Sequence, residues 1–135
     1  MSDVAAVLDT LYEYTWAVDE CDVEALAACF TEDAVIDTTV ADGTAVPQLV
    51  GRRGIVDFIR AGRERQQDRR RHLVTNPRVL EEGDGRAVVH SYLLIAATVE
   101  GQLRVNCTGT YRTEFVLDDG RWRIKAKQIV LDSIY

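Results

Sequence analysis

The first part of the chain places apolar residues at the spacing of an amphipathic helix. They recur every three or four positions, at Val4, Leu8, Leu11, Thr15 and Val18. The polar stretch 19–22 interrupts this pattern, and a second short helix is predicted over residues 23–30. Asp3 and Asp22 are the expected N-caps, because a short carboxylate can accept hydrogen bonds from the first free backbone N–H groups of a helix. The pattern therefore predicts a helical hairpin.

The rest of the chain is mostly extended. Residues 34–40 are rich in β-branched side chains and predict a strand, followed by a loop and a brief strand over 48–50. A third helix is predicted around residues 55–59, whose apolar positions share one face. Beyond it, turns rich in Gly and Asp separate four β-rich segments, at 72–79, 86–99, 103–117 and 121–131. These segments predict an antiparallel meander.

Alternation along these segments assigns side chains to the two faces of the sheet. In the third segment the inward series is expected to be Val105, Cys107, Gly109, Tyr111, Thr113, Phe115 and Leu117. In the last segment the expected inward residues are Trp122, Ile124, Ala126 and Val130, and the expected surface residues are Arg123, Lys125 and Lys127. The second segment is apolar on both faces over residues 87–97, so its outer face is a candidate subunit interface.

The order of these elements defines the fold class. Helices come first, then one or two strands, a helix and a long meander, which is typical of α+β proteins with helices on one face of an antiparallel sheet. We expect a curved, mostly antiparallel sheet wrapped around the N-terminal helices, with a small apolar pocket between them. A length of 135 residues, with 47% hydrophobic and 28% charged residues, fits a single domain over residues 1–135.

The net charge and the hydropathy of the chain limit the classes of partner that we expect. The formal net charge of −6 repels a phosphate backbone and an anionic membrane surface, so neither nucleic acid nor membrane is an expected partner. No apolar run reaches the roughly 18 residues of a membrane span, and the first residues do not form a signal-peptide pattern. We therefore expect a cytoplasmic protein.

Metal and cofactor chemistry has no recognisable motif in the sequence. The three cysteines lack C-x-x-C spacing and there are two histidines, so neither a disulfide framework nor a metal centre is expected. The glycine motifs for phosphates and dinucleotides and the G-x-S-x-G motif are also absent. We expect no cofactor and side-chain acid–base chemistry, for which histidine, with an ordinary pKa of about 6.5, is well suited.

Asp19 and His72 are the candidate catalytic residues. His72 opens a predicted strand, and Asp19 ends the first helix on a stripe that is expected to face the sheet. If Asp19 accepts a hydrogen bond from one ring nitrogen of His72, the other nitrogen is available to take a substrate proton. The alternative is that Asp19 caps the next helix or is solvated, and that His72 bonds to the backbone.

Aromatic and small polar side chains are the candidate walls of the pocket. A Tyr hydroxyl or an Asn amide there could orient a carbonyl or hydroxyl group of a substrate, although the aromatic residues are equally candidates for the core. The candidate substrate-binding residues are Tyr12, Trp16, Phe58, Asn76, Tyr92, Cys107 and Tyr111. The second histidine, His90, is expected to point outward or toward an interface.

Three segments resemble one known family. Residues 14–34, the segment R-H-L-V-T-N over 71–76, and the closing hairpin over 109–124 resemble the SnoaL-like group of the NTF2-like superfamily. The resemblance implies a cone-shaped α+β barrel that forms dimers or trimers. In two of its members, scytalone dehydratase and a lindane dehydrochlorinase, an Asp that ends the first helix pairs with a His on a strand. The matching positions here are Asp19 and His72.

The chain also departs from that pattern. Val18, Thr38 and Ala97 stand where scytalone dehydratase carries two water-holding tyrosines and a second catalytic histidine, so scytalone is not the expected substrate. The sequence predicts a cofactor-independent lyase, isomerase or cyclase that takes a proton from a small hydrophobic ring compound, as in secondary-metabolite biosynthesis. The alternative is a non-catalytic module that binds a small ligand or assembles like the β subunits of ring-hydroxylating dioxygenases.

Overall fold

The computed structural model of the chain describes residues 3–133, which form three helices and six strands. The helices are α1 (Val4–Glu20), α2 (Val23–Ala28) and α3 (Arg52–Arg65). The strands are β1 (Phe30–Val40), β2 (Leu49–Val50), β3 (Arg69–Gly83), β4 (Arg86–Val99), β5 (Gln102–Asp118) and β6 (Arg121–Leu131). Each predicted element is present, and several are longer than the sequence pattern indicated.

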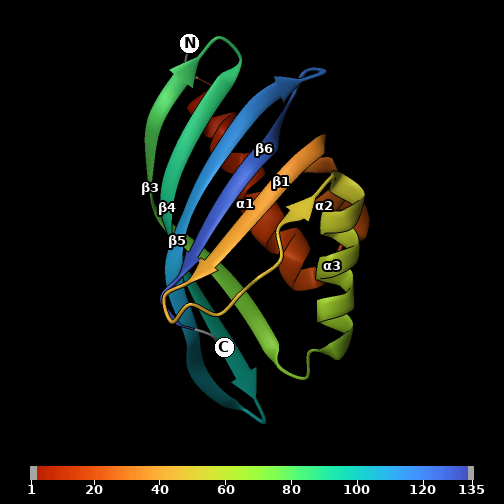
Figure 1. Cartoon of the computed structure of the whole chain (residues 1–135), viewed down its shortest axis with the longest axis vertical. Coiled ribbons are helices and arrows are strands. Elements are labelled where there is room, and N and C mark those ends of the chain that lie inside the picture. The colour runs from red at the N-terminus through yellow and green to blue at the C-terminus, as the bar shows by residue number, and fades with distance from the viewer. Residues whose placement is uncertain (1–2, 134–135) are drawn as a thin grey trace.

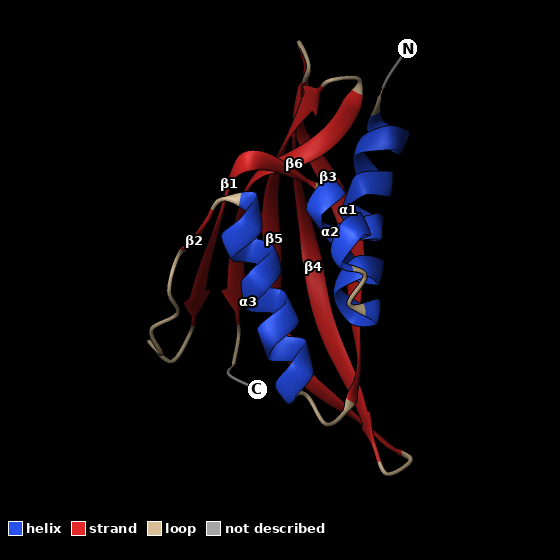
Figure 2. Cartoon of the chain, turned by 90° about the vertical axis from the view of Figure 1, so that its right-hand side faces the viewer, coloured by secondary structure: helices blue, strands red, loops and turns tan. Residues whose placement is uncertain are grey.

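One curved sheet organises the molecule. Its strand order is β2-β1-β6-β5-β4-β3, and every neighbouring pair is antiparallel except β1 and β6, which are parallel. In Figure 1 the viewer looks at the outer face of this sheet, with α1 behind it, and Figure 2 shows the three helices gathered on the inner side. The predicted α+β fold with a mostly antiparallel sheet is confirmed.

The helical hairpin shows how local chemistry sets the element boundaries. The Asp22 side chain accepts a hydrogen bond from the backbone N–H of Ala25 (3.1 Å), so it caps α2 as predicted. Asp3 occupies the predicted N-cap position of α1, but its side chain makes no capping hydrogen bond. Helix α1 ends because Cys21 adopts a left-handed conformation (φ 53°), which turns the chain toward α2.

The buried face of α1 is rotated away from the predicted stripe. Its buried residues include Val7, Leu11 and Tyr14, and these pack into the core. Trp16 is 66% exposed and Tyr12 is also exposed, so these two candidate substrate-binding residues do not face the sheet. Both residues lie about a quarter turn or more around the helix from the centre of the buried face of α1, which places their side chains outside that face.

A β-bulge in β6 changes which residues face the core. In the pairing with β5, Ile124 opposes Phe115 and Ala126 opposes Glu114, so Lys125 is an extra residue. The insertion shifts the alternation by one position from there on. Lys127 is therefore 1% exposed rather than on the surface. The expected inward orientation of Ala126 and Val130 is wrong for the same reason, and Ile129 and Leu131 face inward instead.

Bulges in β3 and β5 also change which side chains face the core. Ile95 opposes Cys107 and Ala96 opposes Val105, so Asn106 is an extra residue and Val105 is exposed on the outer face. In β3 the register shifts between Thr75 and Arg78, and Asn76 takes a positive φ of 52° at this point. Leu117, which was also expected to be buried, lies next to the terminal turn of the β5–β6 hairpin and is exposed.

Candidate active site

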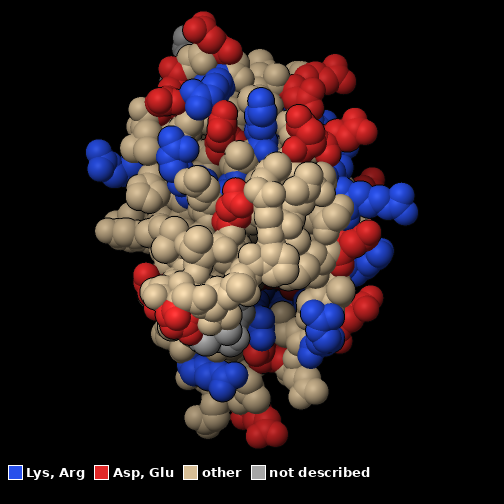
Figure 3. Space-filling view, in the orientation of Figure 1, with Lys and Arg blue, Asp and Glu red and all other residues tan. Residues whose placement is uncertain are grey.

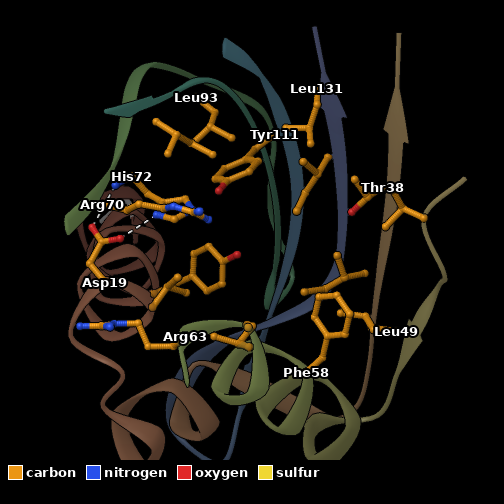
Figure 4. A pocket seen from close by; sticks show the side chains of 18 of the residues that line it. Asp19, Thr38, Leu49, Phe58, Arg63, Arg70, His72, Leu93, Tyr111 and Leu131 are labelled. Atoms are coloured by element: carbon orange, nitrogen blue, oxygen red, sulfur yellow. Dashed lines mark hydrogen bonds and ion pairs between the residues drawn. The ribbon is translucent and has the colours of Figure 1, made fainter. Parts of the chain in front are cut away.

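A cavity of about 340 Å³ lies between the inner face of the sheet, the end of α1 and one face of α3. Most of its wall is apolar, with contributions from β1 (Ile36, Val40), β4 (Leu93, Ile95), β6 (Ile129, Leu131) and α3 (Phe58, Ile59). Figure 4 shows Leu49, Phe58 and Leu131 on one side of this pocket and Asp19, His72, Arg63 and Arg70 on the other. The pocket therefore has an apolar side and a polar side.

Asp19 and His72 meet at the polar side. Asp19 lies in the last turn of α1 and His72 near the start of β3, the edge strand beside α1. The distance between His72 Nδ1 and Asp19 Oδ1 is 2.6 Å, and the His72 backbone N–H donates to Asp19 Oδ2 at 2.9 Å. Both carboxylate oxygens thus bind the same residue, and the two side chains are only 14% and 7% exposed. This geometry fixes the position of the imidazole relative to the helix (Figure 4).

The pair has a defined chemical capability. A carboxylate oxygen at 2.6 Å from Nδ1 is an acceptor, so it favours the tautomer in which Nδ1 carries the proton. In that tautomer Nε2 has a free lone pair, and His72 lines the cavity. An imidazole held in this way can accept a proton from a molecule bound in the pocket.

Two of the seven candidate substrate-binding residues line the cavity. These are Phe58 and Tyr111, and the Tyr111 hydroxyl points into the pocket in Figure 4. The other five lie elsewhere: Tyr12, Trp16, Asn76, Tyr92 and Cys107. The rotation of α1 removes the first two and the β3 bulge displaces the third. Tyr92 is exposed on the outer face of β4, and the Cys107 thiol is buried, with its Sγ donating to the Ser133 carbonyl at 3.0 Å.

Two arginines of the pocket were not among the predicted site residues. Arg63 follows Ile55 and Ile59 at steps of four on α3, and Arg70 precedes His72 by two positions on β3. Both spacings place the arginines on pocket-facing sides, so the sequence did contain a signal for them. Arg70 Nε binds Asp68 Oδ1 (2.8 Å), whereas Arg63 Nε is buried and has no hydrogen-bond partner within residues 3–133.

Lys127 lies behind the pocket wall rather than in it. Its Nζ is 3.6 Å from the ring centroid of Tyr111 and 4.6 Å from that of Tyr14, and it donates to the Thr113 hydroxyl at 2.9 Å. Burial lowers the pKa of Lys127 well below its ordinary value, and the nearby Cys29 has a weaker, opposite effect. Burial also raises the pKa of the Cys29 thiol to about 12. Tyr14 and Tyr111 thus separate a buried amine from the cavity.

Solved structures share this architecture. An NTF2-like protein with a cystatin-like fold from Novosphingobium aromaticivorans aligns with a TM-score of 0.83 at 21% identity, over 96% of this chain and 81% of that chain. A protein assigned as the β subunit of an aromatic-ring-hydroxylating dioxygenase from the same organism gives 0.82 at 19% identity, over 97% and 90%. A Catenulispora acidiphila protein in complex with S-DNPA gives 0.81 at 25% identity, over 95% and 92%. The fold is therefore that of the NTF2-like proteins.

The family follows from the sequence itself. The model of the SnoaL-like domain matches residues 1–128, so the chain belongs to the SnoaL-like domain family, and the resemblance seen in its three segments is confirmed. No curated protein matches the chain significantly. Within residues 3–133, no helix combines the length and apolar character needed to cross a membrane.

Proposed function

We propose that this protein is a cofactor-independent enzyme in which His72, oriented by Asp19, removes a proton from a small hydrophobic ring compound. The observation that carries this proposal is the 2.6 Å contact between His72 Nδ1 and Asp19 Oδ1 at the polar side of an apolar cavity. A general base needs a free ring nitrogen, a fixed orientation and a pocket that holds the substrate, and the contact with Asp19 beside this cavity supports such a role for His72.

The proton balance limits the reaction class. His72 Nε2 forms a bond to hydrogen while the substrate C–H bond breaks, and the electron pair stays on the substrate. That pair either expels a leaving group, as in elimination, or is delocalised onto a conjugated oxygen before isomerisation or cyclisation. Val18 and Thr38 line the pocket where a dehydratase of this family would hold water with tyrosines, which supports a one-base reaction over water delivery.

The small-molecule assignment has independent support. The Catenulispora acidiphila protein solved in complex with S-DNPA is 25% identical in sequence to this chain, and the alignment covers most of both chains. A cavity of about 340 Å³ falls in the range of small-ligand pockets, which is roughly 300–1,000 Å³. We further propose a cytoplasmic location, in which the free thiols Cys21, Cys29 and Cys107 stay reduced.

Hydrogen exchange tests the chemistry without knowledge of the final product. The full-length protein is incubated in D₂O with a panel of polyketide, terpenoid and halogenated ring compounds, and C–H exchange and product formation are followed by NMR. We expect His72→Ala to abolish turnover, with a loss of about 10²- to 10⁴-fold for the base alone. Circular dichroism should stay close to that of the wild type, since the backbone N–H of residue 72 can still donate to Asp19.

Two further variants sharpen this experiment. His72→Asn keeps an N–H group that can donate to Asp19 but has no proton acceptor at the Nε2 position, so it should also be inactive. His90→Ala removes the other, exposed histidine and should keep full activity. Turnover that survives in both His72 variants would contradict the proposal and favour the non-catalytic binding or assembly module.

We also propose that copies of this chain associate through the outer face of the sheet. Several apolar side chains on this face are exposed, namely Leu73, Tyr92, Leu103, Val105 and Val130. Figure 3 shows an uncharged area across the middle of the same face. Light scattering should detect a dimer or trimer that Val105→Asp dissociates, and a monomeric wild type would exclude this association.

A further inference from the structure

The charged side chains at the polar side of the pocket differ in whether their polar atoms have hydrogen-bond partners. Both oxygens of Asp19 accept hydrogen bonds from His72, and Asp68 pairs with Arg70. Arg63 differs, because its Nε is buried and lacks a hydrogen-bond partner within residues 3–133. A buried donor without an acceptor is unfavourable, and a ligand that supplies an acceptor removes that cost.

The position of Arg63 relates this donor to the proposed chemistry. Arg63 lies in the last turn of α3 and lines the same cavity as Asp19, His72 and Arg70. Figure 4 shows all four on one side of the pocket, opposite Leu49, Phe58 and Leu131. The formal charges of Asp19, Asp68, Arg63 and Arg70 cancel while His72 is neutral. When His72 accepts a proton, the net charge of this group of residues becomes positive, which stabilises an anion next to it.

From these contacts we infer that the pocket selects ring compounds that carry one anionic oxygen group, such as a carboxylate, and that Arg63 binds this group. This inference rests on the proposed function, since it names the substrate class of the same site. Arg63 offers a planar set of donors that matches a carboxylate, and a charge-assisted hydrogen bond is stronger in a partly buried site than in water. The apolar side of the cavity then holds the ring.

A matched pair of ligands tests the inference on the full-length protein. 2-Naphthoate and 2-naphthamide have the same bicyclic ring, but only the first is anionic. Calorimetry should show that the wild type binds naphthoate at least about tenfold more tightly than naphthamide. The ring signals of His72, followed by NMR, should shift with either ligand, because both occupy the cavity beside it.

Variants assign the preference to one side chain. Arg63→Gln should lower the affinity for naphthoate about tenfold and leave that for naphthamide within about twofold. Arg65→Gln removes the same charge from an exposed position two residues along the chain, and it should change neither affinity by more than about twofold. Retained binding of naphthamide shows that the pocket of the Arg63 variant is intact.

Two results would overturn the inference. Equal affinities for the acid and the amide in the wild type would show that the pocket does not select anions, and this comparison needs no variant. A preference for naphthoate that persists in Arg63→Gln would show that Arg63 does not bind the anionic group. Neither result depends on turnover, so failure here is distinct from failure of the His72 variants in the exchange experiment.

Discussion

The Asp19–His72 pair and Lys127 are polar groups in the interior of the same protein, but their surroundings differ. Asp19 and His72 are joined by two hydrogen bonds and line a cavity. Lys127 is buried against two tyrosine rings and one hydroxyl, and no carboxylate within residues 3–133 pairs with it. The first group faces a space that a ligand can enter, and the second does not.

This difference distinguishes a polar pair that can serve a function from a polar group that lowers the stability of the fold. Burial of a charge is unfavourable unless a partner compensates for the lost water, and a hydrogen-bonded carboxylate–imidazole pair supplies that partner within the protein. The aromatic rings and the single hydroxyl around Lys127 compensate for less. Substitutions in the two regions should therefore have different effects. Substitution of Asp19 or His72 should lower the activity of the protein, and substitution of Lys127 should raise its stability.

The largest expected effect is on turnover in Asp19→Asn. The amide can accept one of the two hydrogen bonds from His72 but presents an NH₂ group in place of the second oxygen, which favours the tautomer protonated at Nε2. We expect the exchange rate in D₂O to fall by about 10²- to 10⁴-fold. A rate within about threefold of the wild type would mean that Asp19 does not orient the base.

The second effect is on stability at the lysine site. Lys127→Met/Thr113→Val removes the buried ammonium and its hydroxyl partner while nearly preserving volume. The free energy of unfolding should rise by about 1–4 kcal/mol, as measured by urea denaturation, because a buried amine with a single hydroxyl partner is replaced by apolar packing. Lys125→Met removes an exposed lysine two residues away and should change stability by less than about 0.5 kcal/mol. A double variant less stable than the wild type would mean that the aromatic and hydroxyl contacts fully compensate the lysine.

The smallest effect is a pH dependence of that stability difference. Burial lowers the pKa of Lys127 in the folded state, so the unfolded chain binds more protons between that lowered pKa and the ordinary value of about 10.4. The wild type should therefore gain stability relative to the double variant as pH rises through this window, by at most about 1.4 kcal/mol per pH unit.

The groups that face Lys127 must be considered in that measurement. They are Tyr14 of α1, Tyr111 of β5 and the Cys29 thiol at the end of α2, and all three are present in both proteins, so their own titrations largely cancel in the difference. A stability difference that is flat from about pH 7 to 10 would contradict a lowered pKa at Lys127.

Element order was predictable from the sequence because its signals are local. Helical spacing, β-branched runs and glycine turns identified the three helices and six strands of residues 3–133, and Asp22 caps α2 as expected. Asp19 and His72 were singled out from a helix end and a strand start, with support from a family resemblance. Their 2.6 Å contact depends on the docking of α1 against β3, which no local pattern specifies.

The orientations of Lys127 and Val105 were predicted wrongly for one physical reason. A β-bulge adds a single residue and inverts the alternation after it, and nothing in the sequence near Lys125 or Asn106 marks the insertion. Lys127 was therefore expected on the surface and Val105 in the core. The orientation of Trp16 was mispredicted for another reason, because a helix with apolar residues on several sides does not specify which of them packs against the sheet.

The tautomer of His72 is the most direct test of the account. Long-range ¹H–¹⁵N NMR of the full-length protein resolves the ring nitrogens of its two histidines, His72 and His90. In the neutral ring, observed at alkaline pH, we expect the His72 proton on Nδ1 and a free lone pair on Nε2. A His72 ring protonated at Nε2 instead would leave no base facing the pocket and would contradict the proposed function.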